Sequence, residues 1–116
     1  MKNAVVFYEV MIVTDKQYVL VIDAGTQSIR AVIIDLEGNI CEIDRTVVEP
    51  YYSEQPGYAE QDAEYLWDVL CQTTQRLLKN SSINFNQIKG VSVTSQRGTV
   101  VNLDENGKPL RPAIIW

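Results

Sequence analysis

Apolar and polar residues alternate along the first half of the chain in a pattern that predicts three consecutive strands. Tyr18 to Asp23 is a continuous apolar, β-branched run that ends in an acid, which is typical of a strand buried on both faces. Ser28 to Asp35 is a second run of the same character, and Ile40 to Glu49 is a third with looser alternation. Residues 36–39, between the second run and the third, are a hairpin-type turn. Such tight connections predict an antiparallel meander.

A loop and a helix are predicted next. Residues 50–57 contain two prolines and a glycine, which indicate a loop. Asp62 is the predicted helix N-cap, and Glu64 lies in the first turn, where the helix dipole favours an acid. Lys79 lies in the last turn, and residues 80–82 end the helix. The residues at helical spacing predict one core-facing side: Leu66, Val69, Leu70, Thr73 and Leu77.

The last third of the chain predicts further strands. Ile88 to Thr94 alternates valines with small and polar residues and is the predicted fourth strand, and Thr99 to Leu103 is the predicted fifth. Residues 104–107 are a turn signal, after which residues 108–116 can return as a hairpin partner, confined to an edge by two prolines. The fold class is therefore α/β with a mixed sheet, and the order of elements is that of the first half of a ribonuclease-H-like domain. Many α+β domains share this order.

Composition excludes several functional classes. The chain has 116 residues, of which 46% are hydrophobic and 22% charged, so it holds one small folded domain at most. Its net charge is −5 and its basic residues are scattered, which argues against nucleic acid and an anionic membrane surface as partners. It has no histidine and two cysteines, Cys41 and Cys71, so a zinc-type cluster is excluded and two free thiols are expected.

The first 17 residues are predicted to be an N-terminal extension. The apolar run Ala4 to Val13 is too short for a membrane-spanning helix, which needs about 20 apolar residues, and it contains Glu9. Thr14 to Gln17 is a poor signal-peptide cleavage site. The run is either a strand or a leader before the domain, which is expected over residues 18–116.

The turn between the first two strands has the residue types of a phosphate-binding loop. Gly25 lets the backbone turn tightly and brings N–H groups close to an anion. Asp23, at the end of a strand, can hold Mg²⁺ through water. Further donors and a cation follow: Thr26, Gln27, Ser28 and Arg30. An ordinary hairpin turn with a surface aspartate is the alternative that this segment alone leaves open.

Four segments together resemble the FGGY family of carbohydrate kinases. Asp23 to Arg30 resembles its first phosphate motif, D-x-G-T-x-S-x-R, and Gln55 to Asp62 resembles its PGWVEHD element. Ile88 to Arg97 resembles IxGIGxTxQR of the glycerol kinases and IGLSGQMHG of the xylulokinases, and Gly107 to Trp116 resembles GKPLxPAIxW. The resemblance covers residues 18–116 in the family's order, and its first part is also similar to the autoinducer-2 kinases.

This resemblance implies an ATP-dependent, cytoplasmic kinase that transfers the γ-phosphate of MgATP to a hydroxyl of a sugar or polyol. The implied cofactors are ATP and Mg²⁺. The implied cofactor-binding residues are Asp23, Gly25, Thr26, Gln27, Ser28 and Arg30, with Asp23 holding the metal through water. The implied substrate-binding residues are Gln96, Arg97 and Trp116. Gly98 departs from the glycerol kinases, which have Glu there, and from the xylulokinases, which have His nearby, so neither glycerol nor xylulose is directly indicated.

The resemblance also implies that this chain holds only part of an active site. The family's catalytic aspartate lies far downstream and its adenosine site lies mostly in a second domain, so no catalytic residue is expected here. We expect a truncated portion of a kinase that is inactive alone. The alternative is a non-catalytic structural or regulatory module with the same fold.

Other features keep simpler interpretations. The sheet face opposite the helix is expected to be apolar and exposed, covered by Ala4 to Val13, or used for homo-oligomer contacts. For three tyrosines, packing within the loop is a better interpretation than a platform that stacks on sugars: Tyr51, Tyr52 and Tyr58. For Trp67, packing against the fold is a better interpretation than contact with a ligand.

Overall fold

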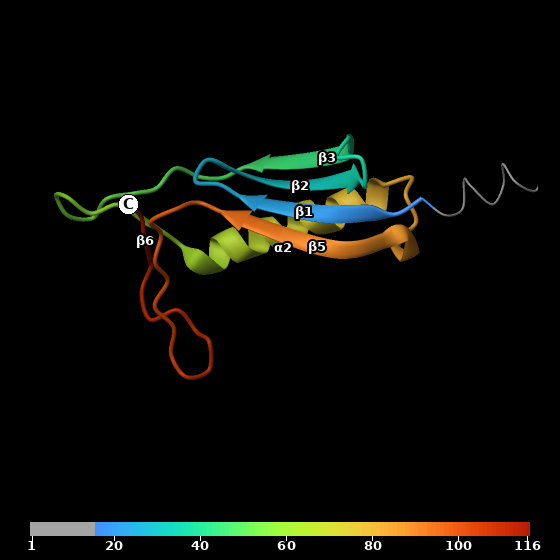
Figure 1. Cartoon of the computed structure of the whole chain (residues 1–116). Helices are drawn as coiled ribbons and strands as arrows, with labels where there is room; N and C mark the ends of the chain where they lie inside the picture. The colour runs from blue at the N-terminus through green and yellow to red at the C-terminus, as the bar shows by residue number, and fades with distance from the viewer. Residues whose placement is uncertain (1–15) are drawn as a thin grey trace, which may run out of the picture.

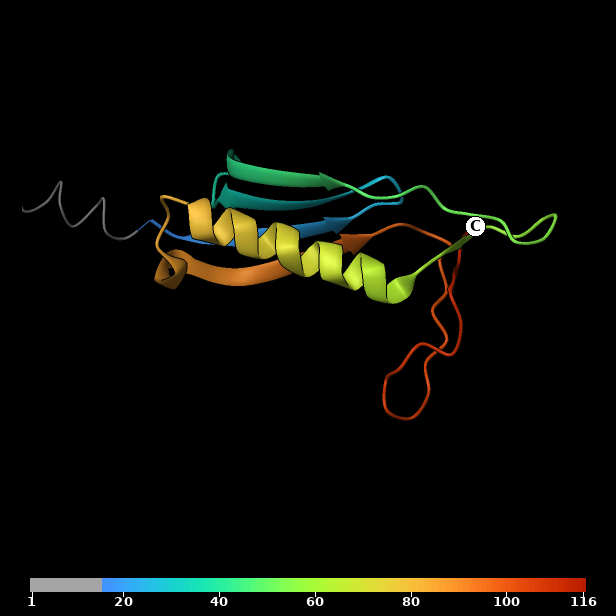
Figure 2. The ribbon, with the colours of Figure 1, turned by 180° about the vertical axis from the view of Figure 1, so that it is seen from behind.

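The structure, a computed structural model, describes residues 16–116, which form a four-stranded mixed sheet with a long helix on one of its faces, and a separate two-stranded sheet (Figures 1 and 2). The predicted N-terminal extension, with Ala4 to Val13, lies outside the described residues apart from Lys16 and Gln17. The order of strands across the four-stranded sheet is β3-β2-β1-β5. The elements are β1 (Tyr18–Ala24), β2 (Ser28–Asp35), β3 (Ile40–Val47), β4 (Glu60–Gln61), α2 (Ala63–Asn80), the 3₁₀ helix η1 (Phe85–Gln87), β5 (Ile88–Ser95) and β6 (Ala113–Ile114).

The predicted antiparallel meander is confirmed. β2 pairs antiparallel with both β1 and β3. The β2–β3 turn is fixed by the Asp35 carboxylate, which accepts hydrogen bonds from the backbone N–H groups of Glu37 at 3.0 Å and Asn39 at 2.8 Å. Gly38 takes a φ of 87°, which side chains disfavour. Hydrogen bonding to Asn39 is the main cause that lowers the pKa of the Asp35 carboxyl.

The fourth predicted strand, β5, pairs parallel with β1 after the crossover through α2. β1 is therefore an inner strand, as its apolar sequence predicts. Parallel pairing places the carboxyl ends of β1 and β5 at one sheet edge, where the Gln96 N–H donates to the Ala24 carbonyl at 2.9 Å. This edge is where the candidate site lies.

Helix α2 begins and ends where its capping residues predict. The Asp62 carboxylate accepts a hydrogen bond from the Tyr65 N–H at 3.0 Å, and Lys79 lies in the last turn. The helix packs mainly on β2 and β3. The Thr73 side chain is fully buried there; its hydroxyl bonds to the Val69 carbonyl at 2.7 Å and to the Thr46 hydroxyl at 2.6 Å. Two core clusters lie between helix and sheet: Leu20, Ile22, Ala31, Ile33 and Leu77; and Ile29, Val48 and Val69.

The predicted return of residues 108–116 beside residues 99–103 is confirmed by antiparallel bridges, but the predicted strands were wrong in extent. Residues 99–103 form no strand; Val100 and Leu103 make only isolated bridges, to Ile114 and Pro109. Residues 108–116 contain just the two-residue β6, which pairs with β4, a strand that the sequence pattern did not predict. Pro109 and Pro112 cannot donate to a ladder, and this hairpin projects away from the four-stranded sheet (Figure 1). Within the described part of the chain, its residues therefore pair only through isolated bridges and with the two-residue β4.

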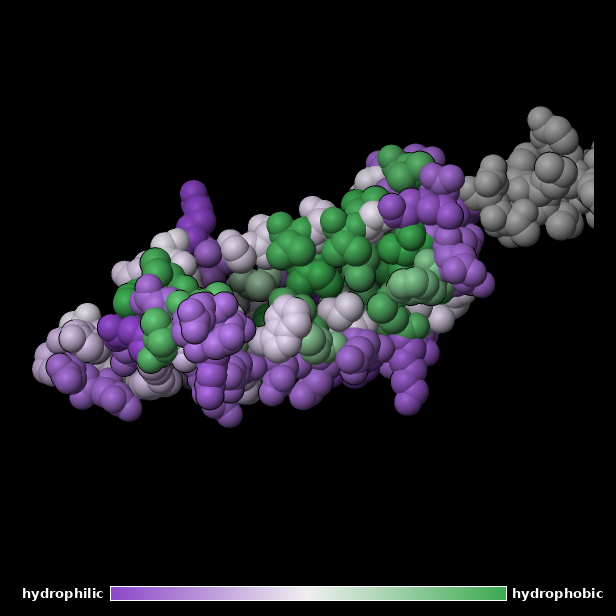
Figure 3. Space-filling view, turned by 90° about the horizontal axis from the view of Figure 1, so that it is seen from below, coloured by the Kyte–Doolittle hydropathy of each residue, from purple (hydrophilic) through white to green (hydrophobic). Residues whose placement is uncertain are grey.

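Helix α2 leaves part of the sheet uncovered. Val91 and Val93 on β5 are the register neighbours of buried Leu20 and Ile22, yet they are 64% and 66% exposed. Figure 3 looks onto the β5 edge and shows apolar side chains gathered along it. The sequence predicted an exposed apolar face opposite the helix. Ile43, which lies on that face, is 55% exposed. Val91 and Val93 of β5, in contrast, lie on the same face of the sheet as the helix. Exposed apolar surface therefore occurs on both faces.

Within residues 16–116, no helix combines the length and apolar character needed to cross a membrane. Both cysteines are free, Cys41 exposed and Cys71 half-buried.

Candidate functional site

The turn that joins β1 to β2 depends on a glycine. The Gly25 N–H donates to the Ser28 carbonyl at 3.1 Å, and a Cβ at Gly25 would lie 3.0 Å from that oxygen. The Gly25 N–H is thus occupied by a hydrogen bond that closes the turn. Within the described part of the chain, the N–H groups of Thr26 and Gln27 have no hydrogen-bond acceptor. These two amides, with the side chains of the turn, are the donors that remain for an anion.

A hydrogen-bonded network of three side chains ties this turn to the end of β5. The Thr26 hydroxyl donates to Oε1 of Gln96. Gln61, which is 3% exposed, donates from Nε2 to the Thr26 carbonyl at 3.1 Å and accepts from Gln96 Nε2 at 3.4 Å. Gln61 is buried and the other two residues are half-buried, and a connected network of this kind rigidifies the site. Sequence reasoning did not single out Gln61; its one signal is its place directly before the helix N-cap.

Charged residues form a row across the sheet beside the turn. Arg30 on β2 donates from its guanidinium to the Asp23 carboxylate on β1 at 2.6 Å. Arg45 on β3 lies directly opposite Arg30 in the antiparallel register. Sequence reasoning missed Arg45, although the period-two pattern of residues 40–49 places it on the same face as Arg30.

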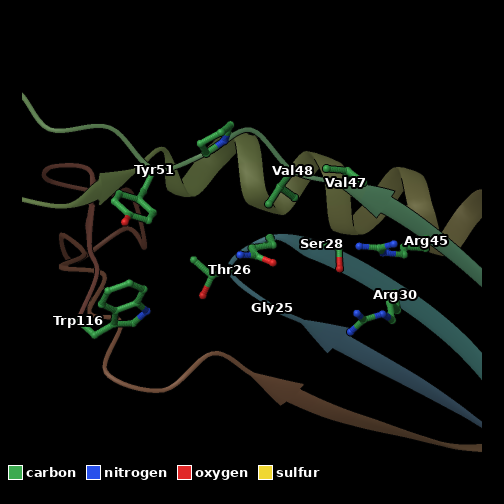
Figure 4. A pocket seen from close by; sticks show the side chains of 11 residues that line it. Gly25, Thr26, Ser28, Arg30, Arg45, Val47, Val48, Tyr51 and Trp116 are labelled. Carbon is green, nitrogen blue, oxygen red and sulfur yellow. The ribbon is translucent and has the colours of Figure 1, made fainter.

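The turn opens into a cavity of about 750 Å³, shown in Figure 4. Six of the predicted site residues line it: Gly25, Thr26, Gln27, Ser28, Arg30 and Trp116. Asp23, Gln96 and Arg97 do not. Tyr51 forms the wall opposite the turn together with Trp116, and the two rings meet edge-on with centroids 5.7 Å apart. Tyr51 therefore contacts Trp116 at the cavity wall, outside the loop in which packing was expected.

Arg97 and Gly98 lie just beyond the end of β5. Arg97 is exposed, and its side chain has no hydrogen-bond partner among residues 16–116. Gly98 has a φ of 70°, and a Cβ there would lie 3.2 Å from the Cβ of Trp116. The backbone conformation and the neighbouring tryptophan both favour glycine at this position.

The described residues fit a magnesium ion only in combination with a ligand. They contain no group of three or more metal-ligating side chains, counting His, Cys, Asp and Glu. Asp23 is a single carboxylate that is already paired with Arg30. Since Mg²⁺ commonly keeps several waters and binds one or two carboxylates plus substrate phosphates, Asp23 suits a water-mediated role beside a bound polyphosphate.

Comparison with known proteins gives consistent results. The N-terminal domain model of the FGGY family of carbohydrate kinases matches residues 18–116. The glycerol kinase of Staphylococcus epidermidis is 37% identical over 102 residues, which cover 87% of this chain and 20% of that protein. The glycerol kinase of Klebsiella pneumoniae is 38% identical over 104 residues, 89% of this chain and 20% of that protein. The chain thus spans about one fifth of the length of the curated relatives it matches.

Solved structures show the same likeness. The xylulose kinase from Rhodospirillum rubrum superimposes with a TM-score of 0.75 at 28% identity, over 85% of this chain and 20% of that one. Plasmodium falciparum glycerol kinase, solved with ADP, gives a TM-score of 0.73 at 32% identity, over 87% of this chain and 20% of that one.

Proposed function

Because the chain belongs to the FGGY family of carbohydrate kinases, we propose that it supplies the phosphate-binding part of the active site of an ATP-dependent kinase. The reaction is transfer of the γ-phosphate of ATP to a hydroxyl of a sugar or polyol. Catalysis of phosphoryl transfer consists mainly of positioning the reactants and stabilising charge on the phosphate oxygens. The residues described above are suited to both tasks.

The observation that carries the proposal is the junction of the β1–β2 turn with the end of β5. The Gln96 N–H bonds to the Ala24 carbonyl at 2.9 Å, and the Thr26 hydroxyl bonds to the Gln96 side chain. A phosphate-type turn and the segment that carries Arg97 are thereby held beside each other at the carboxyl ends of two parallel strands. Ligands of open α/β sheets bind at such edges.

The turn is assigned to the nucleotide phosphates. The free N–H groups of Thr26 and Gln27 donate to phosphate oxygens, together with the hydroxyl of Ser28. Arg30 adds a positive charge at the cavity wall. Asp23 would hold Mg²⁺ through water, and the ion would neutralise charge on the phosphates.

Gln96, Arg97 and Trp116 are assigned to the acceptor. Trp116 offers an apolar wall at the cavity, and Arg97 is a free donor for hydroxyl oxygens. Gly98 supplies no carboxylate beside Trp116. A site that pairs substrate hydroxyls with fewer polar groups discriminates less strongly between acceptors, so the acceptor is assigned only as a sugar or polyol.

The 116-residue chain alone is expected to show no kinase activity. The chain spans one fifth of the length of its curated relatives. The resemblance to the FGGY family implies that the general base and the adenosine site belong to parts of those kinases that this chain does not match. Loss of a general base by itself costs about 10²–10⁴-fold in rate. Sugar-dependent ATP hydrolysis or phosphorylation by the purified chain, above a protein-free blank, would contradict this expectation.

The proposed function is tested in a polypeptide that carries these residues together with the downstream general base. Arg97→Ala is expected to raise the KM for the sugar or polyol about tenfold or more, with the KM for ATP unchanged, because charged hydrogen bonds to the acceptor are lost. Lys89→Ala, an exposed cation on β5, is the matched control. An unchanged acceptor KM and kcat/KM in Arg97→Ala would make Arg97 structural, and a polypeptide that phosphorylates no sugar or polyol would favour a non-catalytic module.

A further inference from the structure

Arg45 belongs to a row of side chains that crosses the sheet at one level. The register pairs Thr94 with Asp23, Asp23 with Arg30, and Arg30 with Arg45, from β5 through β1 and β2 to β3. The neighbouring β2 residues Ile29 and Ala31 are buried on the helix side. Side chains alternate between faces along a strand, so the row lies on the face away from α2.

The placement of Arg45 follows from its own neighbours in the same way. The carboxylate of Asp44 and the hydroxyl of Thr46 both accept hydrogen bonds from Arg76 of α2, at 2.7 Å and 2.8 Å. These residues therefore face the helix, and Arg45 between them faces the opposite side beside Arg30. Figure 4 shows the guanidinium groups of Arg30 and Arg45 extending toward the turn at Gly25.

The row contains more positive than negative charge. The Asp23 carboxylate pairs with Arg30 at 2.6 Å, and the Arg45 guanidinium has no ion-pair or side-chain hydrogen-bond partner within residues 16–116. One carboxylate and two guanidinium groups leave one net positive charge. Like charges directly opposite on neighbouring strands destabilise a sheet, so the free chain gives up stability at this position, and a bound anion would recover it.

The cavity has the charge that an anion requires. The chain has 15 acidic and 10 basic residues, yet the cavity wall contains two arginines, Arg30 and Arg45, and no acidic residue. A positive cavity in an acidic protein concentrates anions there. The guanidinium group also matches the geometry of a phosphate, because its N–H donors form a planar fork.

We propose that Arg45 is a second arginine of the phosphate site, which binds a phosphoryl group alongside Arg30. This inference rests on the proposed function, which assigns the turn at one side of the cavity to phosphates. The phosphoryl group comes either from the nucleotide or from the phosphorylated product, and both present the same oxygens to the two arginines. Arg45 is then a binding residue that the sequence motif does not include.

The test measures anion binding to the purified 116-residue chain by titration followed by NMR. The probes are sodium tripolyphosphate, ADP and glycerol 3-phosphate, at constant ionic strength because surface charges are screened by salt. Arg45→Gln removes the charge, Arg45→Lys keeps the charge without the fork, and Lys79→Gln on the far end of α2 is the control with the same change in net charge.

The expected result is that Arg45→Gln raises the Kd for tripolyphosphate about tenfold, since a charged hydrogen-bonding donor is lost. Arg45→Lys should fall between this variant and the wild type, and Lys79→Gln should match the wild type. Equal weakening for ADP identifies the α- or β-phosphate of the nucleotide as the group that Arg45 binds, whereas weakening for tripolyphosphate and glycerol 3-phosphate without weakening for ADP identifies the phosphoryl group that is transferred to the product.

A second measurement separates a binding role from a structural one. Without ligand, Arg45→Gln should unfold at the same or a higher temperature than the wild type, because it relieves the repulsion from Arg30. Tripolyphosphate should raise the Tm of the wild type more than that of Arg45→Gln, since ligands stabilise the state they bind. A lower Tm of the free variant would make Arg45 a structural residue and overturn the proposal.

Failure of this inference is distinguishable from failure of the proposed function. If the wild type binds the probes and Arg45→Gln binds them equally well, Arg45 is not a ligand of the phosphate site, and the assignment of the cavity stands. If the wild type binds none of the three probes, the cavity is not a phosphate site and both are overturned.

Discussion

Gly25 and Gly90 differ in what a methyl group would meet at each position. A Cβ at Gly25 would lie 3.0 Å from the backbone oxygen of Ser28, whereas a Cβ at Gly90 would meet nothing within 4 Å. Gly25→Ala is therefore expected to destabilise the chain by about 1–3 kcal/mol, because the turn must shift to relieve the overlap. Urea denaturation measures this difference.

Gly90→Ala is the matched control. Gly90 has no positive φ, so alanine there is expected to leave stability unchanged or to raise it by about 0.4–1 kcal/mol through the unfolded state. Equal effects of the two substitutions would show that the turn tolerates a side chain, and the geometric argument for Gly25 would then be wrong.

The ion pair between Asp44 and Arg76 predicts a pH dependence of stability. Two hydrogen bonds of 2.7 Å join the groups, and they lower the pKa of the Asp44 carboxyl from its ordinary value of 3.8. A carboxyl whose folded pKa is lower than its unfolded pKa stabilises the fold at higher pH, and this contribution is lost as pH falls through the folded pKa.

Asp44→Asn is accordingly expected to lower the urea midpoint at pH 7 and to have a smaller effect at about pH 2–3, where the wild type has lost the same contribution. Asp68→Asn, an exposed aspartate on α2 without an ion pair among the described residues, is the control. If the difference between Asp44→Asn and the wild type stayed constant with pH, the ion pair would not be the cause.

At the scale of elements, the N-cap of α2 is a separate contribution to stability. The Asp62 carboxylate accepts the Tyr65 N–H at 3.0 Å, and its loss leaves that donor without a protein partner. Asp62→Ala is expected to cost about 0.5–2 kcal/mol. Asp68→Ala, inside the same helix, is expected to change stability by less than about 0.5 kcal/mol. Thermal unfolding followed by circular dichroism would show the contrast, and similar losses for both would argue against a capping role.

The meander and α2 could be predicted from the sequence because their signals are local. β2 has the predicted bounds, and α2 starts directly after the predicted N-cap. The two-residue strands β4 and β6 could not be predicted, since their pairing joins positions more than fifty residues apart and leaves no period in either segment. Residues 99–103 show the opposite case, in which β-branched residues indicate a strand but the structure has only isolated bridges to Ile114 and Pro109.

The candidate site was predictable in the same uneven way. The turn motif places Thr26 and Arg30 at one cavity, as expected. Arg45 and Tyr51 reach that cavity from β3 and the loop after it, and no short motif contains them. The contact between Gly98 and Trp116 joins residues 18 positions apart through a hairpin, so only the three-dimensional structure reveals it.

At the scale of the whole molecule, the exposed valines of β5 predict self-association of the purified chain. Val91 and Val93 extend the buried row of Leu20 and Ile22 to the edge of the sheet and are about two-thirds exposed. Apolar surface of this kind favours contact between copies. Sedimentation velocity is expected to show a concentration-dependent shift to larger species, which the double variant Val91→Thr, Val93→Thr reduces.

Val101→Thr provides the control for this prediction, because Val101 is an exposed valine outside the four-stranded sheet. It should associate as the wild type does. If the double variant associates as strongly as Val101→Thr, the contact between copies lies elsewhere on the surface.

The parallel pairing of β1 with β5 has a consequence for the order in which the chain folds. The meander pairs strands that are adjacent in sequence, whereas β5 joins β1 only after residues 25–87 have been brought into a closed loop. Closing such a loop costs chain entropy before any contact compensates it, so non-local pairing is slow. Helical ellipticity is therefore expected to appear earlier in refolding than the hydrogen bond between Thr26 and Gln96, and the junction between the phosphate turn and the segment that carries Arg97 should be the last part of the site to form.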